Sequence, residues 1–248
     1  LNPEDEESLF WYSNFTWEAK DIEIFDNLIR NSKNKAILFS SKRSRCGLSY
    51  EKNDPRVIDF CEEYLNIAPP SDFLRWTGIL MESYIKSNNS NKEILKGIAL
   101  ANKVLKTYPK DLYFMWWKSK GFSIMKETKQ FSNEKRYFAI EQISSRMIKL
   151  LEGRYDKDFN IDLEDLNWYK ASAYDNRGLA RQMLIPNDVN NLYSNKKYKQ
   201  AKTACKDRKT AANLDESFYQ DYMTYYKFNC EDKRLIDNYA PWKNPNST

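Results

Sequence analysis

The chain has 248 residues, of which 41% are hydrophobic and 30% charged, with a formal net charge of +5; this composition is typical of a globular protein with a sizeable core. It contains no histidine, which excludes Ser-His-Asp and Cys-His catalysis, histidine-ligated zinc and haem with an axial histidine. Its six glycines are never closer together than 19 residues, so glycine-rich nucleotide-binding loops and the GxSxG motif are excluded too. We expect no cofactor, and no apolar stretch approaches the roughly 18 residues of a membrane helix.

The first 53 residues are expected to form an N-terminal helix followed by a basic loop that packs on the rest of the chain. Pro3 and the four acidic residues after it are typical of a helix start, and apolar residues continue at helical spacing to about Arg30. Residues 33–53 are the least helical part, with a short strand or buried loop expected at 36–40. Residues 1–31 hold eight acids and two cations, whereas Lys33–Arg45 holds five cations and no acid. The two charged segments could each form a solvated face. Alternatively, they could attract each other, or the basic segment could attract an acidic partner.

Residues 54–230 are expected to be a series of helices joined by short turns. Proline and acidic residues mark the junctions, as in Tyr108-Pro109-Lys110-Asp111, where one helix ends and the next is capped. Residues 231–248, which contain Pro241 and Pro245, are expected to form a loose tail. The fold class is therefore all-α, with helices expected at about 55–66, 73–86, 92–108, 112–128, 134–152, 163–184, 196–213 and 216–230.

Three helix pairs share a pattern in which a large residue is followed one turn later by a small one. The pairs of residues are Leu74 with Gly78, Trp117 with Gly121, and Trp168 with Ser172. The small residue allows a neighbouring helix to approach closely, and the large residue fills the space beside it. The partner helices carry small residues of their own, for example Gly97, Ala101 and Ala201. The pattern favours stacked helix pairs, and an irregular helical bundle is the alternative.

The pattern resembles the tetratricopeptide repeat family, whose 34-residue units follow W-x2-L-G-x2-Y, then A-x3-F-x2-A, then P. The resemblance covers about residues 71–230 and is degenerate. Trp117 and Trp168 are 51 residues apart, and Lys120 occupies the position of the family's leucine. The resemblance implies antiparallel helix pairs stacked as a right-handed solenoid, in which the first helix of each pair lines a concave surface.

A non-enzymatic scaffold that binds another protein or an acidic peptide is the function that the resemblance implies. Cations beside aromatic side chains would hold the carboxylates of an extended segment. Two roles in the cell envelope are expected, an accessory to transport or assembly, or an immunity-type blocker of a toxin; an oligomer is compatible with either. By resemblance, the groove residues are Arg75, Lys118, Phe122, Lys126, Tyr169 and Arg177.

Two other functions remain open. A helical enzyme could use paired carboxylates on a carbohydrate-like substrate, with Glu82, Glu127 and Asp175 as candidates by elimination. A nucleic-acid binder could use residues 196–209, which hold seven cations and one acid. No base-reading motif accompanies this segment, so a charged solvent face is the simpler interpretation and nucleic acid is not the expected partner. Its basic stripe consists of Lys199, Lys202, Lys206 and Lys209.

The four cysteines, Cys46, Cys61, Cys205 and Cys230, form two local pairs, 15 and 25 residues apart, with no CxxC spacing. Disulfides 46–61 and 205–230 are expected among three connectivities, and no metal site is expected. The chain begins at Leu1 with acidic residues, so we expect a removed signal peptide and a periplasmic or secreted, bacterial protein. A cytoplasmic protein with four thiols is the alternative.

Overall fold

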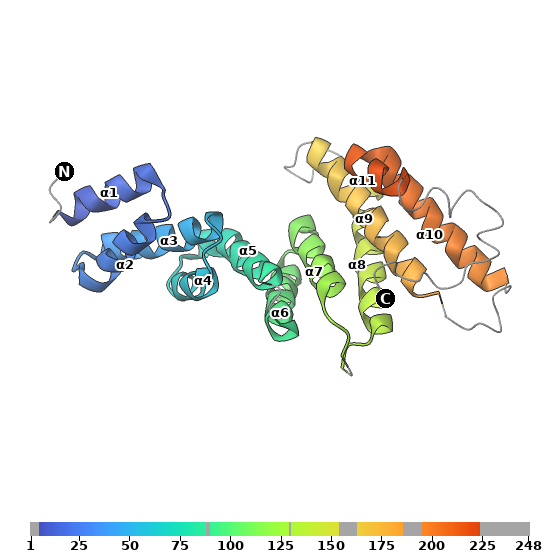
Figure 1. Cartoon of the computed structure of the whole chain (residues 1–248), viewed down its shortest axis with the longest axis horizontal. Coiled ribbons are helices and arrows are strands. Elements are labelled where there is room, and N and C mark those ends of the chain that lie inside the picture. The colour runs from blue at the N-terminus through green and yellow to red at the C-terminus, as the bar shows by residue number, and fades with distance from the viewer. Residues whose placement is uncertain (1–4, 88–89, 129, 154–162, 186–194, 224–248) are drawn as a thin grey trace, which may run out of the picture. The chain divides into compact units, whose positions relative to one another are not determined.

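The structure of the chain is a computed structural model that describes residues 5–87, 90–128, 130–153, 163–185 and 195–223. These residues form helices and their connections, and no strand occurs among them (Figure 1). The prediction of an all-α fold is confirmed. The chain divides into two compact units, Leu1–Val104 and Leu105–Thr248.

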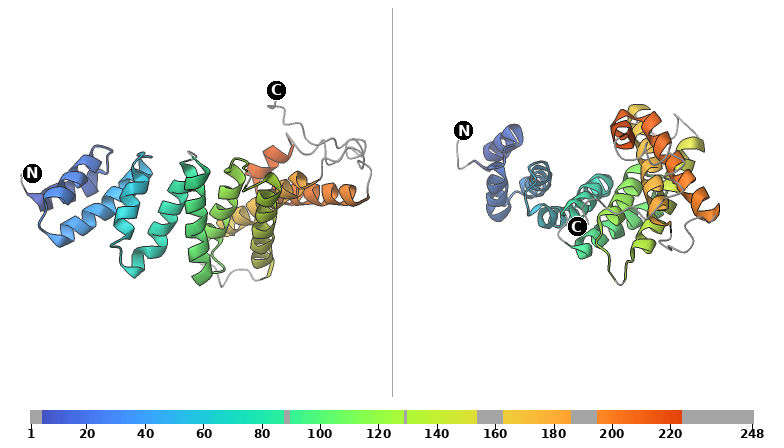
Figure 2. Two further views of the ribbon diagram at one scale, coloured as in Figure 1. Left: turned by 90° about the horizontal axis from the view of Figure 1, so that it is seen from below. Right: turned by 45° about the vertical axis from the view of Figure 1, so that its right-hand side comes forward.

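Within the first unit, helices that follow one another in sequence pack against one another, as Figure 2 shows. The connections are short, so each helix lies next to its predecessor. The last of these helices crosses the boundary and ends in the second unit. The helices are α1 (Glu6–Thr16), α2 (Asp21–Asn31), α3 (Lys35–Glu51), α4 (Val57–Leu65), α5 (Pro70–Lys86) and α6 (Asn91–Thr107).

The single N-terminal helix predicted to reach Arg30 is two helices, α1 and α2. Helix α1 ends because Trp17 takes a left-handed backbone conformation with φ of 51°. The buried carboxylate of Asp21 then fixes the bend, since its Oδ2 accepts hydrogen bonds from Thr16 Oγ1 at 2.6 Å and from the backbone N–H of Glu18 at 2.7 Å. A left-handed residue breaks the helical repeat that the apolar spacing alone suggested.

The prediction of a basic loop with a strand or buried loop at 36–40 was wrong, because this segment is helix α3. Asn34 caps the helix, and its side-chain oxygen accepts from the backbone N–H of Ala36 at 3.0 Å. The cations are accommodated by acids of neighbouring helices. Arg45 is buried and forms ion pairs with Asp26 of α2 and Glu63 of α4.

A disulfide links α3 to α4 in the core of the first unit. Cys46 and Cys61 are both fully buried, and their sulfur atoms are 2.00 Å apart. Tyr64 and Trp76 pack around them. The predicted 46–61 pairing is confirmed. Cys205 is also disulfide-bonded, but Cys230 lies outside the described residues, so the 205–230 pairing stays a prediction.

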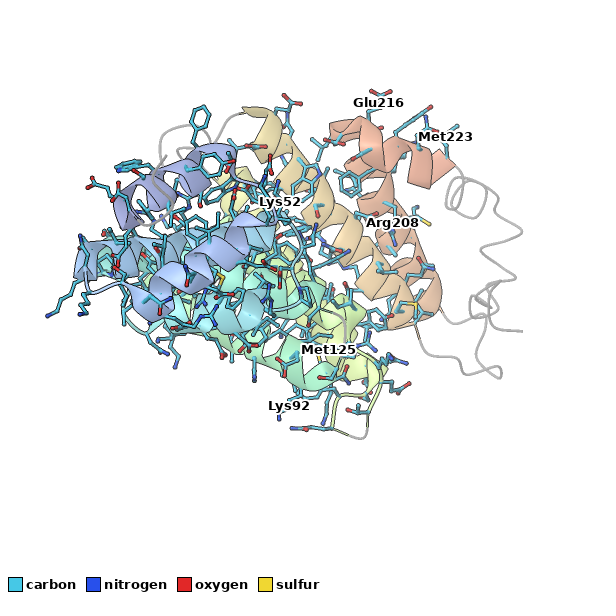
Figure 3. The ribbon with its side chains drawn as sticks, turned by 60° about the vertical axis from the view of Figure 1, so that its left-hand side comes forward. Lys52, Lys92, Met125, Arg208, Glu216 and Met223 are labelled. Atoms are coloured by element: carbon cyan, nitrogen blue, oxygen red, sulfur yellow. A yellow bond between two sulfur atoms is a disulfide. The ribbon has the colours of Figure 1, made fainter. Side chains whose placement is uncertain are left out.

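In the second unit, consecutive helices again pack on one another, most extensively α8 on α9 and α9 on α10. Trp116 of α7 packs on Trp168 of α9, with ring centroids 5.1 Å apart, and its Nε1 donates to Ser172 Oγ at 2.7 Å. Arg208, labelled in Figure 3, belongs to α10 and forms an ion pair with Asp175 of α9. The helices are α7 (Leu112–Ile124), α8 (Asn133–Gly153), α9 (Leu163–Met183), α10 (Asn195–Leu214) and α11 (Glu216–Asp221). The predicted helix end at Cys230 and the tail at 231–248 lie outside the described residues.

Candidate binding groove

A groove with a cavity volume of about 490 Å³ lies in the first unit. Its walls come from α1 and the residue that ends it, from α3 and from α5. Five of the lining side chains are aromatic, two are arginines and one is a glutamate. These residues are Phe10, Trp11, Trp17, Tyr50 and Trp76, Arg43 and Arg75, and Glu51.

Gly47 of α3 lets two indole rings lie against the helix backbone. A Cβ atom at this position would be 3.2 Å from Cη2 of Trp76 and 3.6 Å from Cζ2 of Trp17, which is tighter than ordinary contact for the first ring. The Trp17 ring is also held by its Nε1, which donates to Glu51 Oε2 at 2.5 Å. The glycine and this hydrogen bond therefore place two aromatic walls of the groove.

Two guanidinium groups lie near the Trp76 ring. Cζ of Arg75 is 5.5 Å from its ring centroid and Cζ of Arg43 is 5.9 Å away, both within the range of a cation–π contact. Arg43 also has Nε 3.6 Å from Asp72 Oδ2. Arg75 forms no ion pair or hydrogen bond within the described part of the chain. Of the two cations that line the groove, Arg75 is therefore the one that pairs with no acid among the described residues.

The apolar wall continues onto the solvent side of α1. Trp11, which lines the groove, is 64% exposed, and Phe15, one turn further along the same helix, is 90% exposed. Isolated exposed apolar residues are common, but Trp11 and Phe15 are four residues apart and so lie on the same face of α1. This surface is available for contact with a ligand longer than the groove.

Tyr50 is fixed in the groove wall by a buried carboxylate. Its hydroxyl donates a hydrogen bond to Glu82, which is only 5% exposed and also forms an ion pair with Lys86. Burial raises the pKa of Tyr50, and the bond to Glu82 raises it further. Glu82 was a candidate catalytic carboxylate, but here it positions a tyrosine.

The predicted groove residues of the second unit do not line the groove that contains Arg75. Lys118 is half-buried in α7, where burial lowers its pKa and the nearby Arg146 lowers it further. Phe122 is half-buried, and its carbonyl oxygen accepts from Arg136 Nε at 3.1 Å. Lys126 follows the end of α7 and is exposed.

The two predicted groove residues on α9 are engaged in packing. Tyr169 packs against the core cluster around Leu112 and Met147, and burial raises its pKa to about 12, with contributions from Asp111 and Asp165. Arg177 donates from Nε and Nη2 to the two carboxylate oxygens of Asp207, at 2.9 and 2.7 Å. Of the six predicted groove residues, only Arg75 lines the groove of the first unit. Ligand binding by the other five stays a prediction.

The remaining candidates of the sequence are distributed over the second unit. Lys202, Lys206 and Lys209 are exposed on α10, whereas the Lys199 side chain lies outside the described residues. The two other acids offered as catalytic have partners: Asp175 pairs with Arg208, and Glu127 accepts from Asn133 Nδ2 at 2.7 Å. Among the described residues, no cluster of Cys, Asp and Glu side chains could hold a metal ion.

The groove was not predicted because α3 was not recognised as a helix. Its lining positions on α3 nonetheless follow a helical period: Ser40, Arg43, Ser44, Gly47, Tyr50 and Glu51. Spacings of three and four residues place them on one face. That spacing, read together with the Asn34 cap, was the signal in the sequence that could have revealed both the helix and its groove face.

Comparison with known proteins adds no assignment to this geometry. None of the described helices is long and apolar enough to cross a membrane. No family model matches the chain, and no curated protein or solved structure matches it either.

Proposed function

We propose that this chain is a non-enzymatic helical scaffold that binds a segment of another protein in the groove of the first unit. The observation that carries the proposal is the groove itself, an aromatic-walled cavity of about 490 Å³ that contains an arginine without an acidic partner among the described residues. Aromatic and arginine side chains are the ones that contribute most to binding at protein interfaces. The sequential packing of helices supports a repeat scaffold of the tetratricopeptide type.

The candidate carboxylates do not favour the enzymatic alternative. Glycosidases of the usual kind need two acids that face each other across a substrate, about 5–10 Å apart. Glu82, Glu127 and Asp175 instead each make contacts within the fold, with Tyr50, Asn133 and Arg208 respectively. A binding function uses the aromatic wall and the arginine of the groove. Hydrolysis would need two acids that face a substrate, whereas these three acids face partners within the fold.

We propose a periplasmic or secreted location, with a role as an envelope accessory protein or as a blocker of a toxin. The support for the location is the Cys46–Cys61 disulfide, whose two cysteines are fully buried in the first unit. Structural disulfides persist in oxidising compartments and are rare in the reducing cytosol.

The binding function can be tested with a displayed library of random 12-residue peptides, selected against the full chain. Trp11→Ala is the test variant, because the side chain lines the groove and is 64% exposed, so its loss should not disturb the fold. Phe138→Ala is the matched control, an aromatic residue that is 53% exposed on α8. Selected peptides should bind the wild type and the control equally, and bind Trp11→Ala about tenfold or more weakly.

Two results would contradict the proposal. One is that the selection yields no peptide that binds the wild-type chain. The other is that the selected peptides bind Trp11→Ala as tightly as they bind the wild type.

A further inference from the structure

We infer that the groove recognises a carboxylate next to an apolar side chain, with Arg75 as the residue that binds the carboxylate. The inference rests on the proposed binding function and adds the chemistry of the ligand. It assigns the anion contact to one residue and the apolar contact to the aromatic wall that includes Trp11.

The charges that line the groove do not cancel. Glu51 accepts the indole N–H of Trp17 at 2.5 Å, and Arg43 lies 3.6 Å from Asp72. Arg75 has no such partner in the described part of the chain. The indole N–H is uncharged and leaves the negative charge of Glu51 in place, so two arginines and one glutamate give the lining an excess of one positive charge. A carboxylate therefore meets an unpaired cation, whereas an ammonium group is repelled by two arginines and attracted by Glu51 alone.

The position of Arg75 suits a carboxylate. Its Cζ is 5.5 Å from the centroid of the Trp76 ring, and the Trp76 side chain is 4% exposed and so cannot move freely. A guanidinium that contacts an aromatic ring keeps the N–H groups at its edge available, and these fit the two oxygens of a carboxylate. The ring thus orients the arginine before the ligand arrives, which lowers the entropic cost of binding.

The apolar contact lies beside this cation. Trp11 lines the same groove, and Phe15 extends the aromatic surface one turn further along α1. A peptide that ends in an aromatic residue can present both groups, and so can one with an acidic side chain next to an aromatic one. The two peptides share the same chemistry and differ in the source of the carboxylate.

The experiment uses three N-acetylated tripeptides and the full chain labelled with ¹⁵N at its seven tryptophans. Ac-Phe-Asp-Phe-NH₂ offers a side-chain carboxylate, Ac-Phe-Asn-Phe-OH a terminal carboxylate, and Ac-Phe-Asn-Phe-NH₂ none. Shifts of the indole N–H signals during titration give the affinities. Trp11, Trp17 and Trp76 line the groove, and Trp11→Phe and Trp17→Phe identify the indole signals of the first two.

We expect at least one carboxylate peptide to bind about tenfold or more tightly than the neutral peptide, the effect of one charge-assisted hydrogen bond. The carboxylate peptide that binds more tightly shows whether the groove prefers a side-chain carboxylate or a terminal one. Arg75→Gln should reduce the affinity of that peptide to the affinity of the neutral one. Lys206→Gln, which removes an exposed cation on α10, should change nothing.

Three outcomes would overturn the inference. If all three peptides bind equally, the groove takes apolar segments without using a charge, and the proposed function still stands. If Arg75→Gln keeps the preference for carboxylate, Arg75 is not the anion contact. If no peptide moves any indole signal, the ligand chemistry is wrong, and the library selection alone then decides whether the groove binds peptides. Because Arg75 is exposed, an unchanged circular dichroism spectrum is expected for its variant.

Discussion

Replacement of Gly97 by alanine is expected to destabilise the first unit, because α5 and α6 meet at this glycine with no space for a methyl group. A Cβ atom there would be 2.8 Å from Cγ1 of Ile85, 3.0 Å from the backbone oxygen of Met81 and 3.2 Å from Cβ of Tyr84. A rotation of Ile85 relieves the first contact only. The other two involve atoms fixed to the backbone of α5, so α6 has to move away.

Two effects of opposite sign set the size of the change. Alanine in a helix is more stable than glycine by roughly 0.5–1 kcal/mol. Overpacking of a filled core typically costs about 1–3 kcal/mol. Because two of the three close contacts involve immobile atoms, the steric cost should exceed the gain, and we expect a net loss of about 1–2 kcal/mol. Asn102→Ala is the matched control, since Asn102 is an exposed residue of the same helix and its replacement gains roughly half a kcal/mol without a new contact.

Native-state hydrogen exchange at the amides of α5 and α6 is the suitable assay. The chain has two compact units, so a single melting temperature would not report on one of them. Exchange measures the free energy of opening locally. Amides of α5 and α6 should exchange about tenfold faster in Gly97→Ala and no faster in Asn102→Ala. Equal or slower exchange in Gly97→Ala would show that the two helices have room for the methyl group, and the argument from close approach would fail.

Two further predictions concern α3 and α4. Replacement of both Cys46 and Cys61 by alanine should lower the free energy of unfolding by about 3 kcal/mol, because the disulfide spans 15 residues; urea unfolding measures the loss, and mass spectrometry of the unreduced wild type checks the bond. Burial acts to raise the pKa of Glu63, but its bonds with Lys42 and Arg45 outweigh burial and leave the pKa below the ordinary value of a glutamate. The stability from Glu63 is therefore present above its unfolded pKa and is lost as the pH falls through the folded pKa. The stability difference between wild type and Glu63→Gln should be present at pH 7 and should decrease as the pH falls below the ordinary range of a glutamate; a difference that is unchanged in strong acid would contradict this assignment.

The helices after residue 54 could be predicted because their signals are local. The start of α7 is an example: Asp111 was expected to cap a helix from Leu112, and its Oδ1 accepts from the backbone N–H of Phe114 at 3.1 Å. Caps, prolines and apolar spacing act within one or two turns. The small residue at Gly97 is a second example, since it does allow α5 to approach closely.

Helix α3 has a local signal in its Asn34 cap, but the run of cations concealed it, because the acids that balance these cations are distant in sequence. Arg45 is buried only because Asp26 and Glu63, 19 and 18 residues away, accept its hydrogen bonds. A run of five cations without an acid looks unsuited to a packed helix when it is read alone. The acids that balance it lie on α2 and α4, and only the tertiary structure brings them together.

The residues predicted to line a groove in the second unit show a related limit of sequence-based prediction. Arg177 occupies a position that resembles a groove-lining one, but Asp207 of α10 holds its guanidinium at 2.7 and 2.9 Å. A family pattern locates a residue on a helix face. It does not show whether another helix covers that face, because the answer depends on the partner helix and its charges.

The number of cations in a segment is therefore a poor guide to where this chain binds an anion. The basic run of α3 is largely balanced, since Lys42 and Arg45 pair with Glu63 and Arg43 lies near Asp72. Solvated lysines such as those on α10 gain little from one more counterion, because water and salt already screen them. Arg75 is exposed too, but it has no acidic partner among the described residues, and its guanidinium contacts the Trp76 ring beside an apolar wall. A carboxylate that binds there gives up contacts with water and salt and gains an oriented, charge-assisted hydrogen bond from the Arg75 guanidinium. This is the physical reason to place the anion contact at one arginine of the groove rather than in the most basic segment of the sequence.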